Sequence, residues 1–199
     1  MNVTARSALL VVGAYLLGSI PFGAVLARLK GVNLRQVASG NIGATNVARA
    51  MGKGWAVAVL LADAAKGFVP VWLGRHWQLP DLVVAGAGLA AIVGHMFTLF
   101  LRGRGGKGVA TSLGVSLALS PVFALIGFGA YVVVFALTRL SSLGSLLGVW
   151  TFSVGFVVAR RPPLASWPYV VLALGGAALV TLRHRGNIQR LVRGEEKKA

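Results

Sequence analysis

The chain has 199 residues and a formal net charge of +16, yet only 12% of its residues are charged and 56% are hydrophobic. A soluble domain carries roughly 25% charged residues, so this composition excludes an ordinary water-soluble fold. The absence of cysteine excludes disulfides and cysteine metal sites. Because the chain has only four acidic residues, a carboxylate-based metal site is not expected, and we predict no metal and no cofactor.

A net positive charge is compatible with nucleic-acid binding. Here, however, the basic residues cluster in loops between apolar runs, as they do in the cytoplasmic loops of membrane proteins. We therefore expect membrane lipid, and no nucleic acid, as a partner. The first apolar run follows Arg6 without a small-residue cleavage pattern, so we interpret it as a retained span and not as a signal peptide.

Apolar runs of the length needed to cross a bilayer, about 20 residues, recur along the chain. They cover residues 7–29, 55–74, 82–101, 109–137, 142–159 and 164–182. The fourth run has 29 residues and contains Ser120–Pro121 near its middle. It is compatible with one tilted helix or with two short spans. Proline removes a backbone donor and disfavours helix at the preceding residue, which favours two.

The basic segments decide between these topologies. Residues 30–54, residues 102–107 and the tail after Leu182 are all basic, and the positive-inside rule assigns all three to the cytoplasm. An even number of crossings must then separate the second loop from the tail. We predict an all-α polytopic membrane protein, a single domain over 1–199, with seven transmembrane helices, the N-terminus outside and the C-terminus cytoplasmic. This topology leaves Arg160 and Arg161 outside, against the rule.

The first basic loop alternates small residues with hydroxyl and amide side chains. Glycines let backbone N–H groups converge on an anion, and an arginine adds a bidentate fork for phosphate, a role we assign to Arg49. A flexible polar turn is the alternative, but it needs no such density of donors. The candidate phosphate ligands before Arg49 are Ser39, Gly40, Asn41, Gly43, Thr45 and Asn46.

The second basic loop resembles the nucleotide P-loop but departs from it at two positions. Gly108 follows Lys107 where Ser or Thr would bind magnesium, and Leu101 occupies the first glycine position. Glycines that lead into a helix N-terminus beside a lysine still favour anions. The candidate ligands are Gly105, Gly106, Lys107 and Gly108.

The third basic segment follows the last apolar run and contains Arg183, His184, Arg185 and Asn187. A juxtamembrane cluster that binds anionic lipid would explain the arginines. It would not explain His184 and Asn187, which lie at i and i+3 and so share a helical face.

Two further features each allow a functional and a structural interpretation. Asp63 and Lys66 lie at i and i+3 within the second span, where buried ionisable groups are functional candidates but an intrahelical ion pair is at least as good an explanation. Ser142 and Ser145 begin the sixth span, where serine also serves as a helix cap.

His76 and Asp81 have the His-x4-Asp spacing of one large class of acyltransferases. They flank Pro80 in a short turn on the side opposite the basic loops. We interpret this match as chance.

With these motifs in place, the chain resembles the bacterial acyl-phosphate:glycerol-3-phosphate acyltransferase family almost from end to end. The matching segments are residues 39–49, 63–67, 94–95, 105–111, 142–143 and 183–190. The sequence departs from the family at Thr98, where proline is frequent, and at Arg102–Gly103–Arg104, where the family is apolar or aromatic. These departures affect the shape of the second loop and no matched motif residue.

The resemblance implies an integral enzyme of phospholipid synthesis in the bacterial inner membrane, with a cytoplasmic active site. It would transfer an acyl group from acyl phosphate to the 1-hydroxyl of glycerol 3-phosphate, giving lysophosphatidic acid and phosphate. Functional coupling to the enzyme that makes acyl phosphate would fit this role. The resemblance implies important roles for Ser39, Arg49, Lys107, His184 and Asn187, with Ser142 and the glycine loops as supporting ligands.

For the mechanism we expect a clamp of Arg49, Lys107, Arg183 and Arg185 on the two phosphates, and direct attack without an acyl-enzyme. The proton acceptor is either His184 or an oxygen of the donor phosphate. A transporter of a small organic phosphate is the main alternative, although the later spans offer it almost no polar residues. A scaffold for anionic lipid is the other.

Overall fold

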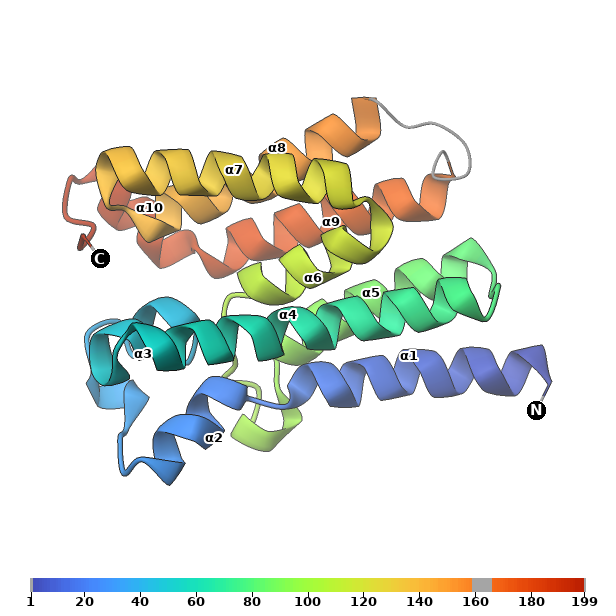
Figure 1. Cartoon of the computed structure of the whole chain (residues 1–199), viewed down its shortest axis with the longest axis horizontal. Coiled ribbons are helices and arrows are strands. Elements are labelled where there is room, and N and C mark those ends of the chain that lie inside the picture. Colours follow the sequence, from blue (N-terminus) through green and yellow to red (C-terminus); the bar gives the residue numbers. More distant parts are fainter. Residues whose placement is uncertain (1, 159–165, 199) are drawn as a thin grey trace.

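The computed structural model describes residues 2–158 and 166–198 (Figure 1). Within these residues every regular element is a helix and none is a strand, which confirms the predicted all-α class. Two 3-10 turns, η1 (Leu34–Gln36) and η2 (Leu99–Leu101), accompany the α-helices. The α-helices are α1 (Val3–Ser19), α2 (Phe22–Leu29), α3 (Ala44–Met51), α4 (Lys53–His76), α5 (Asp81–Met96), α6 (Val109–Leu119), α7 (Pro121–Thr138), α8 (Ser141–Val158), α9 (Trp167–Arg183) and α10 (Arg185–Val192).

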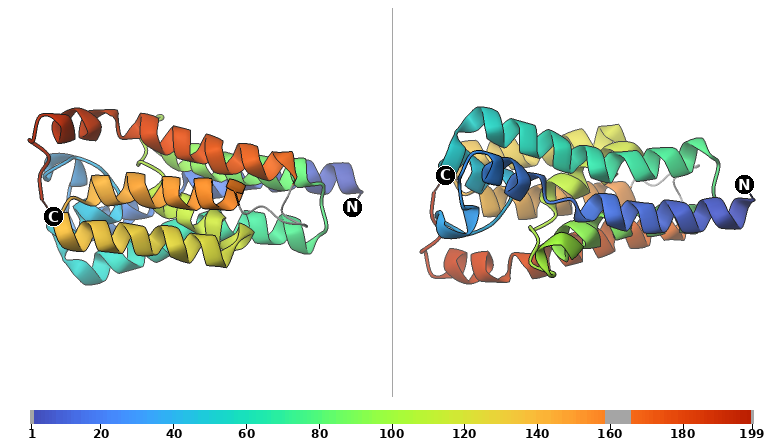
Figure 2. Two further views of the ribbon diagram at one scale, coloured as in Figure 1. Left: turned by 90° about the horizontal axis from the view of Figure 1, so that it is seen from above. Right: turned by 90° about the horizontal axis from the view of Figure 1, so that it is seen from below.

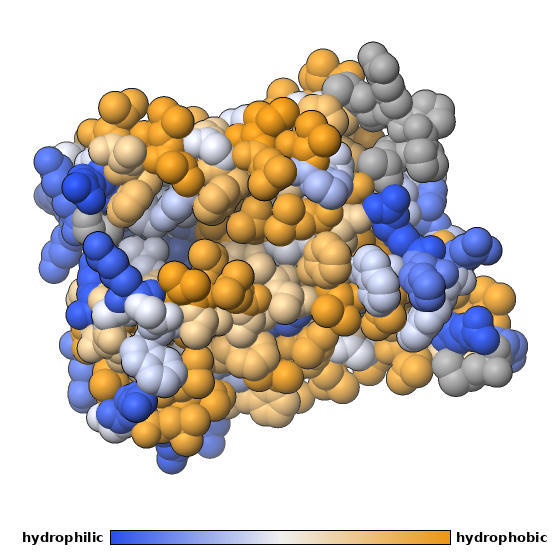
Figure 3. Space-filling view, in the orientation of Figure 1, coloured by the Kyte–Doolittle hydropathy of each residue, from blue (hydrophilic) through white to orange (hydrophobic). Residues whose placement is uncertain are grey.

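Several of these helices have the length and hydropathy of membrane spans. In the described part of the chain five segments qualify: α1 with α2, α4, α5 with η2, α7 and α8. The apolar helices α6 and α9 are shorter. On the face shown in Figure 3, hydrophobic side chains cover most of the middle of the molecule and hydrophilic ones gather toward its two ends. The protein is therefore a multi-pass membrane protein.

The two ends of the bundle differ in what they carry. Helices α3 and α10 and the C-terminus lie at one end, and the N-terminus lies at the other (Figures 1 and 2). We call the end with α3 and α10 the loop end. Arg160, Arg161 and the beginning of the predicted last span fall outside the described residues.

The first predicted span is not one continuous helix. Residues 7–29 were expected to form a single run, but Ile20 is extended, with φ −62° and ψ 115°, and it separates α1 from α2. The reason is Pro21, which has no N–H and disfavours helix at the residue before it. The break allows α2 to leave the line of α1 (Figure 1).

The long apolar stretch 109–137 does divide at Ser120–Pro121, as predicted, into α6 and α7. The first half, α6, has only 11 residues and runs beside the second half of α4. A Cβ on Gly67 of α4 would lie 2.1 Å from the Thr111 oxygen at the start of α6, and a Cβ on Gly114 would lie 1.8 Å from the Ala64 oxygen. The second basic loop therefore enters the bundle partway along α4.

Small residues also bring the other helix pairs into close contact, as is usual between helices in a membrane. A Cβ on Gly18 of α1 would lie 2.4 Å from the Ala91 oxygen of α5. A Cβ on Gly127 of α7 would lie 2.6 Å from the Gly148 oxygen of α8. These backbone contacts form the rigid frame that carries the loops.

Candidate active site

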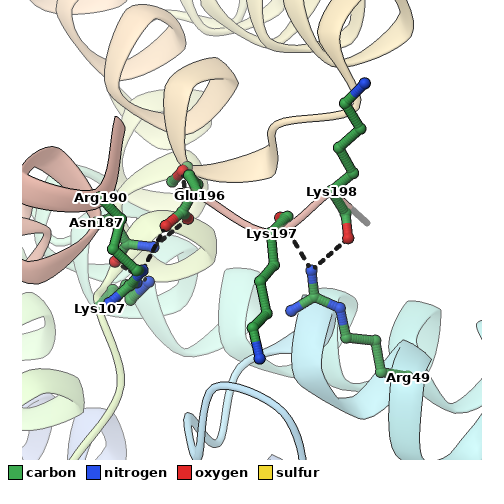
Figure 4. A network of polar contacts seen from close by, with 8 residues as sticks. Arg49, Lys107, Asn187, Arg190, Glu196, Lys197 and Lys198 are labelled. Atoms are coloured by element: carbon green, nitrogen blue, oxygen red, sulfur yellow. Dashed lines mark hydrogen bonds and ion pairs between the residues drawn. The ribbon is translucent and has the colours of Figure 1, made fainter. Parts of the chain in front are cut away.

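A chain of polar contacts joins the second loop to α10 and the C-terminal tail (Figure 4). Lys107 Nζ donates to Asn187 Oδ1 at 2.5 Å, and Asn187 Nδ2 donates to Glu196 Oε1 at 2.5 Å. Glu196 also accepts hydrogen bonds from Ser142 Oγ and from Arg190 Nε, both at 2.7 Å. Three of the predicted site residues, Lys107, Ser142 and Asn187, are thus brought together around one carboxylate.

Glu196 is held as an anion. Burial by itself raises the pKa of the Glu196 carboxyl, but hydrogen bonds from Asn187, Ser142 and Arg190 outweigh it, and the pKa lies below its usual value. A carboxylate with so many donors shows that this pocket of side chains is built to hold negative charge.

Lys107 lies where several cations converge. Burial lowers the pKa of the Lys107 ammonium to about 8, Glu196 opposes the shift, and Arg190, Arg49 and Arg183 lower the pKa further. Lys107 therefore remains charged at neutral pH, and the three arginines around it outnumber the one carboxylate, Glu196. Such a site attracts an anion.

His184 is buried at the junction of α9 and α10 and is only 2% exposed. Its Nδ1 lies 2.8 Å from the Val180 oxygen, so Nδ1 carries the proton and Nε2 is left as an acceptor. Burial and the charge of Lys107 lower the His184 pKa to about 4. The ring is therefore neutral at physiological pH, as a proton acceptor must be.

In the second loop, the N–H groups of Gly105 and Gly106 are not available to an anion. Gly105 N–H donates to the Met96 oxygen at 3.1 Å, and Gly106 N–H donates to the His95 oxygen at 3.0 Å. These donors are occupied by the end of α5. The glycines are required for a different reason, because a Cβ on Gly105 would lie 2.0 Å from the His95 oxygen.

Gly108 and Gly43 each precede the first residue of a helix, α6 and α3 respectively, and neither helix has a side-chain cap. The first N–H groups of these two helices have no side-chain acceptor, and helix N-termini of this kind favour anions. Anion binding at the N-termini of α6 and α3 therefore stays a prediction.

In the first loop, Asn46 has a structural role that the sequence did not reveal. Its Nδ2 donates to the Leu34 oxygen at 3.0 Å and to the Asn41 oxygen at 2.8 Å, and the residue is 1% exposed. The predicted phosphate donor is thus occupied in shaping the loop. Thr45 Oγ1 contacts Ser141 Oγ at 3.0 Å, which ties the loop to the start of α8.

Ser39 is exposed, and its Oγ accepts from Asn41 N–H at 3.4 Å. Among the described residues, no hydrogen bond joins Ser39 to Lys107 or His184. Arg35, which sequence reasoning missed, connects the two loops instead: it donates to the Gly40 oxygen at 3.1 Å and also to the Arg104 oxygen.

The predicted arginine clamp is divided among different tasks. Arg49 is exposed and donates to the Lys198 oxygen of the C-terminal tail at 3.1 Å. Arg183 donates to the oxygens of Gly105 and Gly106, both at 3.2 Å, and thereby supports the second loop. Arg185 is exposed at the start of α10.

Glu196 and Arg190 were also missed. Glu196 is one of only four acidic residues in a chain of net charge +16. This scarcity is the one sequence feature that indicates a special role for Glu196. Its partner Ser142 lies 54 positions away, and no sequence pattern connects the two residues.

The fold and this arrangement define a multi-pass helical membrane protein with a cationic site at one end of its bundle. A sequence model of the glycerol-3-phosphate acyltransferase family matches residues 8–194. The chain belongs to this family, which confirms the resemblance noted from its motifs.

Two relatives illustrate the match along the whole chain. The chain is 51% identical to a glycerol-3-phosphate acyltransferase of Anaeromyxobacter sp. (strain Fw109-5), covering 100% of this chain and 98% of the relative. It is 43% identical to the glycerol-3-phosphate acyltransferase of Aquifex aeolicus (strain VF5), covering 96% of this chain and 98% of the relative.

Two crystal structures of PlsY (YgiH), an integral membrane glycerol 3-phosphate acyltransferase, have the same fold. The glycerol 3-phosphate form gives a TM-score of 0.93 at 43% identity and covers 98% of this chain and 96% of that one. The lysophosphatidic acid form gives a TM-score of 0.90 at 42% identity and covers 97% and 95%.

Proposed function

We propose that this protein transfers a fatty acyl group from acyl phosphate to the 1-hydroxyl of glycerol 3-phosphate, forming lysophosphatidic acid and inorganic phosphate. The observation that carries the proposal is the cluster of Lys107, Asn187, Arg190 and Glu196 at the loop end of a bundle that belongs to this acyltransferase family. The relatives with a glycerol 3-phosphate form and a lysophosphatidic acid form support the acceptor and the product.

Positive charge is the main requirement of such a reaction, since both substrates carry phosphate. Two unit charges 4 Å apart repel by about 4 kcal/mol at an effective dielectric constant near 20. The charges of Lys107, Arg49 and Arg190, which all act on one place, offset this repulsion. Ser142 Oγ–H and one Asn187 Nδ2–H are donated to Glu196, so the second N–H of Asn187 is the neutral donor that remains beside them.

The chemical step mainly requires that the protein hold the two substrates in the correct relative orientation. The 1-hydroxyl oxygen of glycerol 3-phosphate attacks the acyl carbonyl carbon, the new ester C–O bond forms, and the bond from that carbon to the phosphate oxygen breaks with its electron pair leaving on phosphate. The hydroxyl proton passes to His184 Nε2, which is unprotonated at neutral pH, and then to the departing phosphate. A phosphate oxygen of the donor is the alternative acceptor.

The placement of Ser39 supports direct transfer. A serine nucleophile needs a base within hydrogen-bond reach, and among the described residues the Ser39 hydroxyl has one hydrogen bond, from the backbone N–H of Asn41. We therefore propose that no acyl-Ser39 intermediate forms. Trapping of an acyl group on Ser39 after mixing with acyl phosphate alone would overturn this mechanism.

We further propose seven crossings with the loop end in the cytoplasm, at the inner membrane. The opposite positions of the N-terminus and α10 in the bundle support an odd number of crossings (Figure 1). The chain has no cysteine, so single cysteines placed at Lys53 and Gln78 report on the two sides without background labelling. Cysteine at 53 should react with an impermeant thiol reagent only from the cytoplasmic side, and cysteine at 78 only from the outside.

The deciding experiment supplies purified protein with acyl phosphate and labelled glycerol 3-phosphate. Lysophosphatidic acid and phosphate should appear in equal amounts, and a Lys107→Ala variant should form far less of both. If no lysophosphatidic acid forms but liposomes containing the protein accumulate labelled glycerol 3-phosphate, the transporter reading replaces the enzyme. If the protein neither forms lysophosphatidic acid nor accumulates glycerol 3-phosphate in liposomes, a scaffold for anionic lipid is the remaining function.

A further inference from the structure

A buried ionic cluster of Asp63, Lys66 and His95 lies inside the bundle and has no part in the mechanism above. Lys66 Nζ is 2.8 Å from Asp63 Oδ1, and His95 Nδ1 is 3.6 Å from the same oxygen. The three residues are 3%, 2% and 4% exposed. Ionisable groups inside a membrane bundle are costly to bury and commonly have a function.

Lys66 stabilises the interruption between α1 and α2. Its Nζ donates to the Ile20 oxygen at 2.8 Å, at the point where Pro21 interrupts the helix. Beyond the break, α2 packs on the first loop so closely that a Cβ on Gly23 would lie 1.9 Å from the Ile42 oxygen. The position of the first loop therefore depends on the direction that the chain takes at this break.

His95 holds the second loop. Its backbone oxygen accepts from Gly106 N–H at 3.0 Å. Its ring also packs against the same residue, since a Cβ on Gly106 would lie 2.2 Å from His95 Nε2. Lys107 is the next residue. The orientation of the His95 ring, which lies beside Asp63, therefore determines the position of the Lys107 backbone.

We infer that the ionic cluster of Asp63, Lys66 and His95 is a positioning group, which fixes the first and second loops relative to each other so that Lys107 meets the substrate phosphates. This inference rests on the proposed acyl transfer. The three residues act through Ile20 and Gly106 and do not touch substrate. A cluster that merely stabilised α4 would need no contact with either loop.

The test separates position from stability by labelling a thiol at residue 107. Lys107→Cys introduces the only thiol of the chain, and its reaction rate with a thiol reagent reports on the loop without requiring activity. Asp63→Asn and His95→Gln are each combined with it. Asp81→Asn is the matched control, because Asp81 also accepts a side-chain hydrogen bond, from Tyr169 Oη at 2.9 Å, but lies at the opposite end of α5.

We expect Asp63→Asn and His95→Gln to change the labelling rate at residue 107 about tenfold, and Asp81→Asn to leave it unchanged. With Lys107 intact, the first two variants should raise the KM for glycerol 3-phosphate more than they lower kcat. Unchanged labelling and unchanged KM in protein that unfolds at a lower temperature would overturn the inference and leave a purely stabilising cluster.

Two features keep the outcome interpretable. If Asp63→Asn does not fold, His95→Gln carries the test, since it retains the ion pair between Asp63 and Lys66. If the unmodified protein forms no lysophosphatidic acid, the proposed function fails, whereas the labelling rates still decide whether the cluster positions the loop.

Discussion

Lys107 Nζ lies 2.5 Å from Asn187 Oδ1, although the two residues are 80 positions apart in the chain. This contact joins the loop before α6 to the helix after the last apolar segment. It places a cation, an amide and, through Glu196, a carboxylate in one polar group at the loop end.

Replacing Asn187 with alanine should weaken catalysis strongly. The change leaves Lys107 and Glu196 without their shared partner, and loss of a buried hydrogen-bonding group costs roughly 1–3 kcal/mol, or about 5- to 150-fold in kcat/KM. Steady-state kinetics with acyl phosphate and glycerol 3-phosphate measure the effect. Gln189→Ala, at an exposed position of the same helix, is the control and should behave as the unmodified protein.

Substrate affinity should fall as the pH rises through the Lys107 pKa. That pKa is about 8, so Lys107 is charged below it and increasingly neutral above it, while the phosphate of glycerol 3-phosphate is already fully ionised. The Kd for glycerol 3-phosphate should therefore increase above pH 8, by up to about tenfold per pH unit. Calorimetric titration from pH 6.5 to 9.5 checks this. The increase should disappear in Lys107→Arg, and an identical profile in that variant would contradict the assignment.

Glu196→Gln should lower both stability and activity. The change removes the charge that pairs with Arg190 and weakens the hydrogen bonds from Ser142 and Asn187, which together should cost roughly 1–3 kcal/mol. Thermal unfolding and kcat/KM report the two effects. Glu195→Gln removes the same charge from the exposed neighbouring residue and should alter neither; equal effects at both positions would show that only net charge matters.

Gly67→Ala should destabilise the contact between α4 and α6. The added Cβ would lie 2.1 Å from the Thr111 oxygen, which is backbone and cannot move aside cheaply, so a loss of roughly 1–3 kcal/mol is expected. Gly54→Ala in the same helix meets nothing within 4 Å and should be neutral or stabilising by up to about 1 kcal/mol. Tryptophan fluorescence during heating follows both variants.

Much of this architecture could be predicted because proline, glycine and basic residues act locally. Ser120–Pro121 predicted the division of the long apolar stretch, and the basic loops predicted which segments share an end of the bundle. Ile20–Pro21 carries the same local signal, but the apolar run continues on both sides of it, so its hydropathy predicts one continuous span. Hydropathy alone does not distinguish a continuous span from a broken one.

The remaining site features depend on contacts that no local pattern encodes. Whether Gly106 N–H faces an anion or the end of α5 is decided by how closely His95 approaches, and that depends on packing. The roles of Glu196 and Arg35 likewise depend on contacts with segments 54 and 69 positions away. The sequence therefore predicted several of the residues at the site, but it did not predict the hydrogen-bond partners of these residues.

The short length of α6 has a consequence for where the two substrates meet. Its first turn lies beside Gly67, which at 1.5 Å per residue is roughly 20 Å along α4 from Lys53. We therefore expect glycerol 3-phosphate to enter from the loop end, and the fatty chain of the donor to remain in the bilayer. Because α6 is short, the polar loop before it lies close to the bilayer. The acyl donor can therefore react without leaving the membrane.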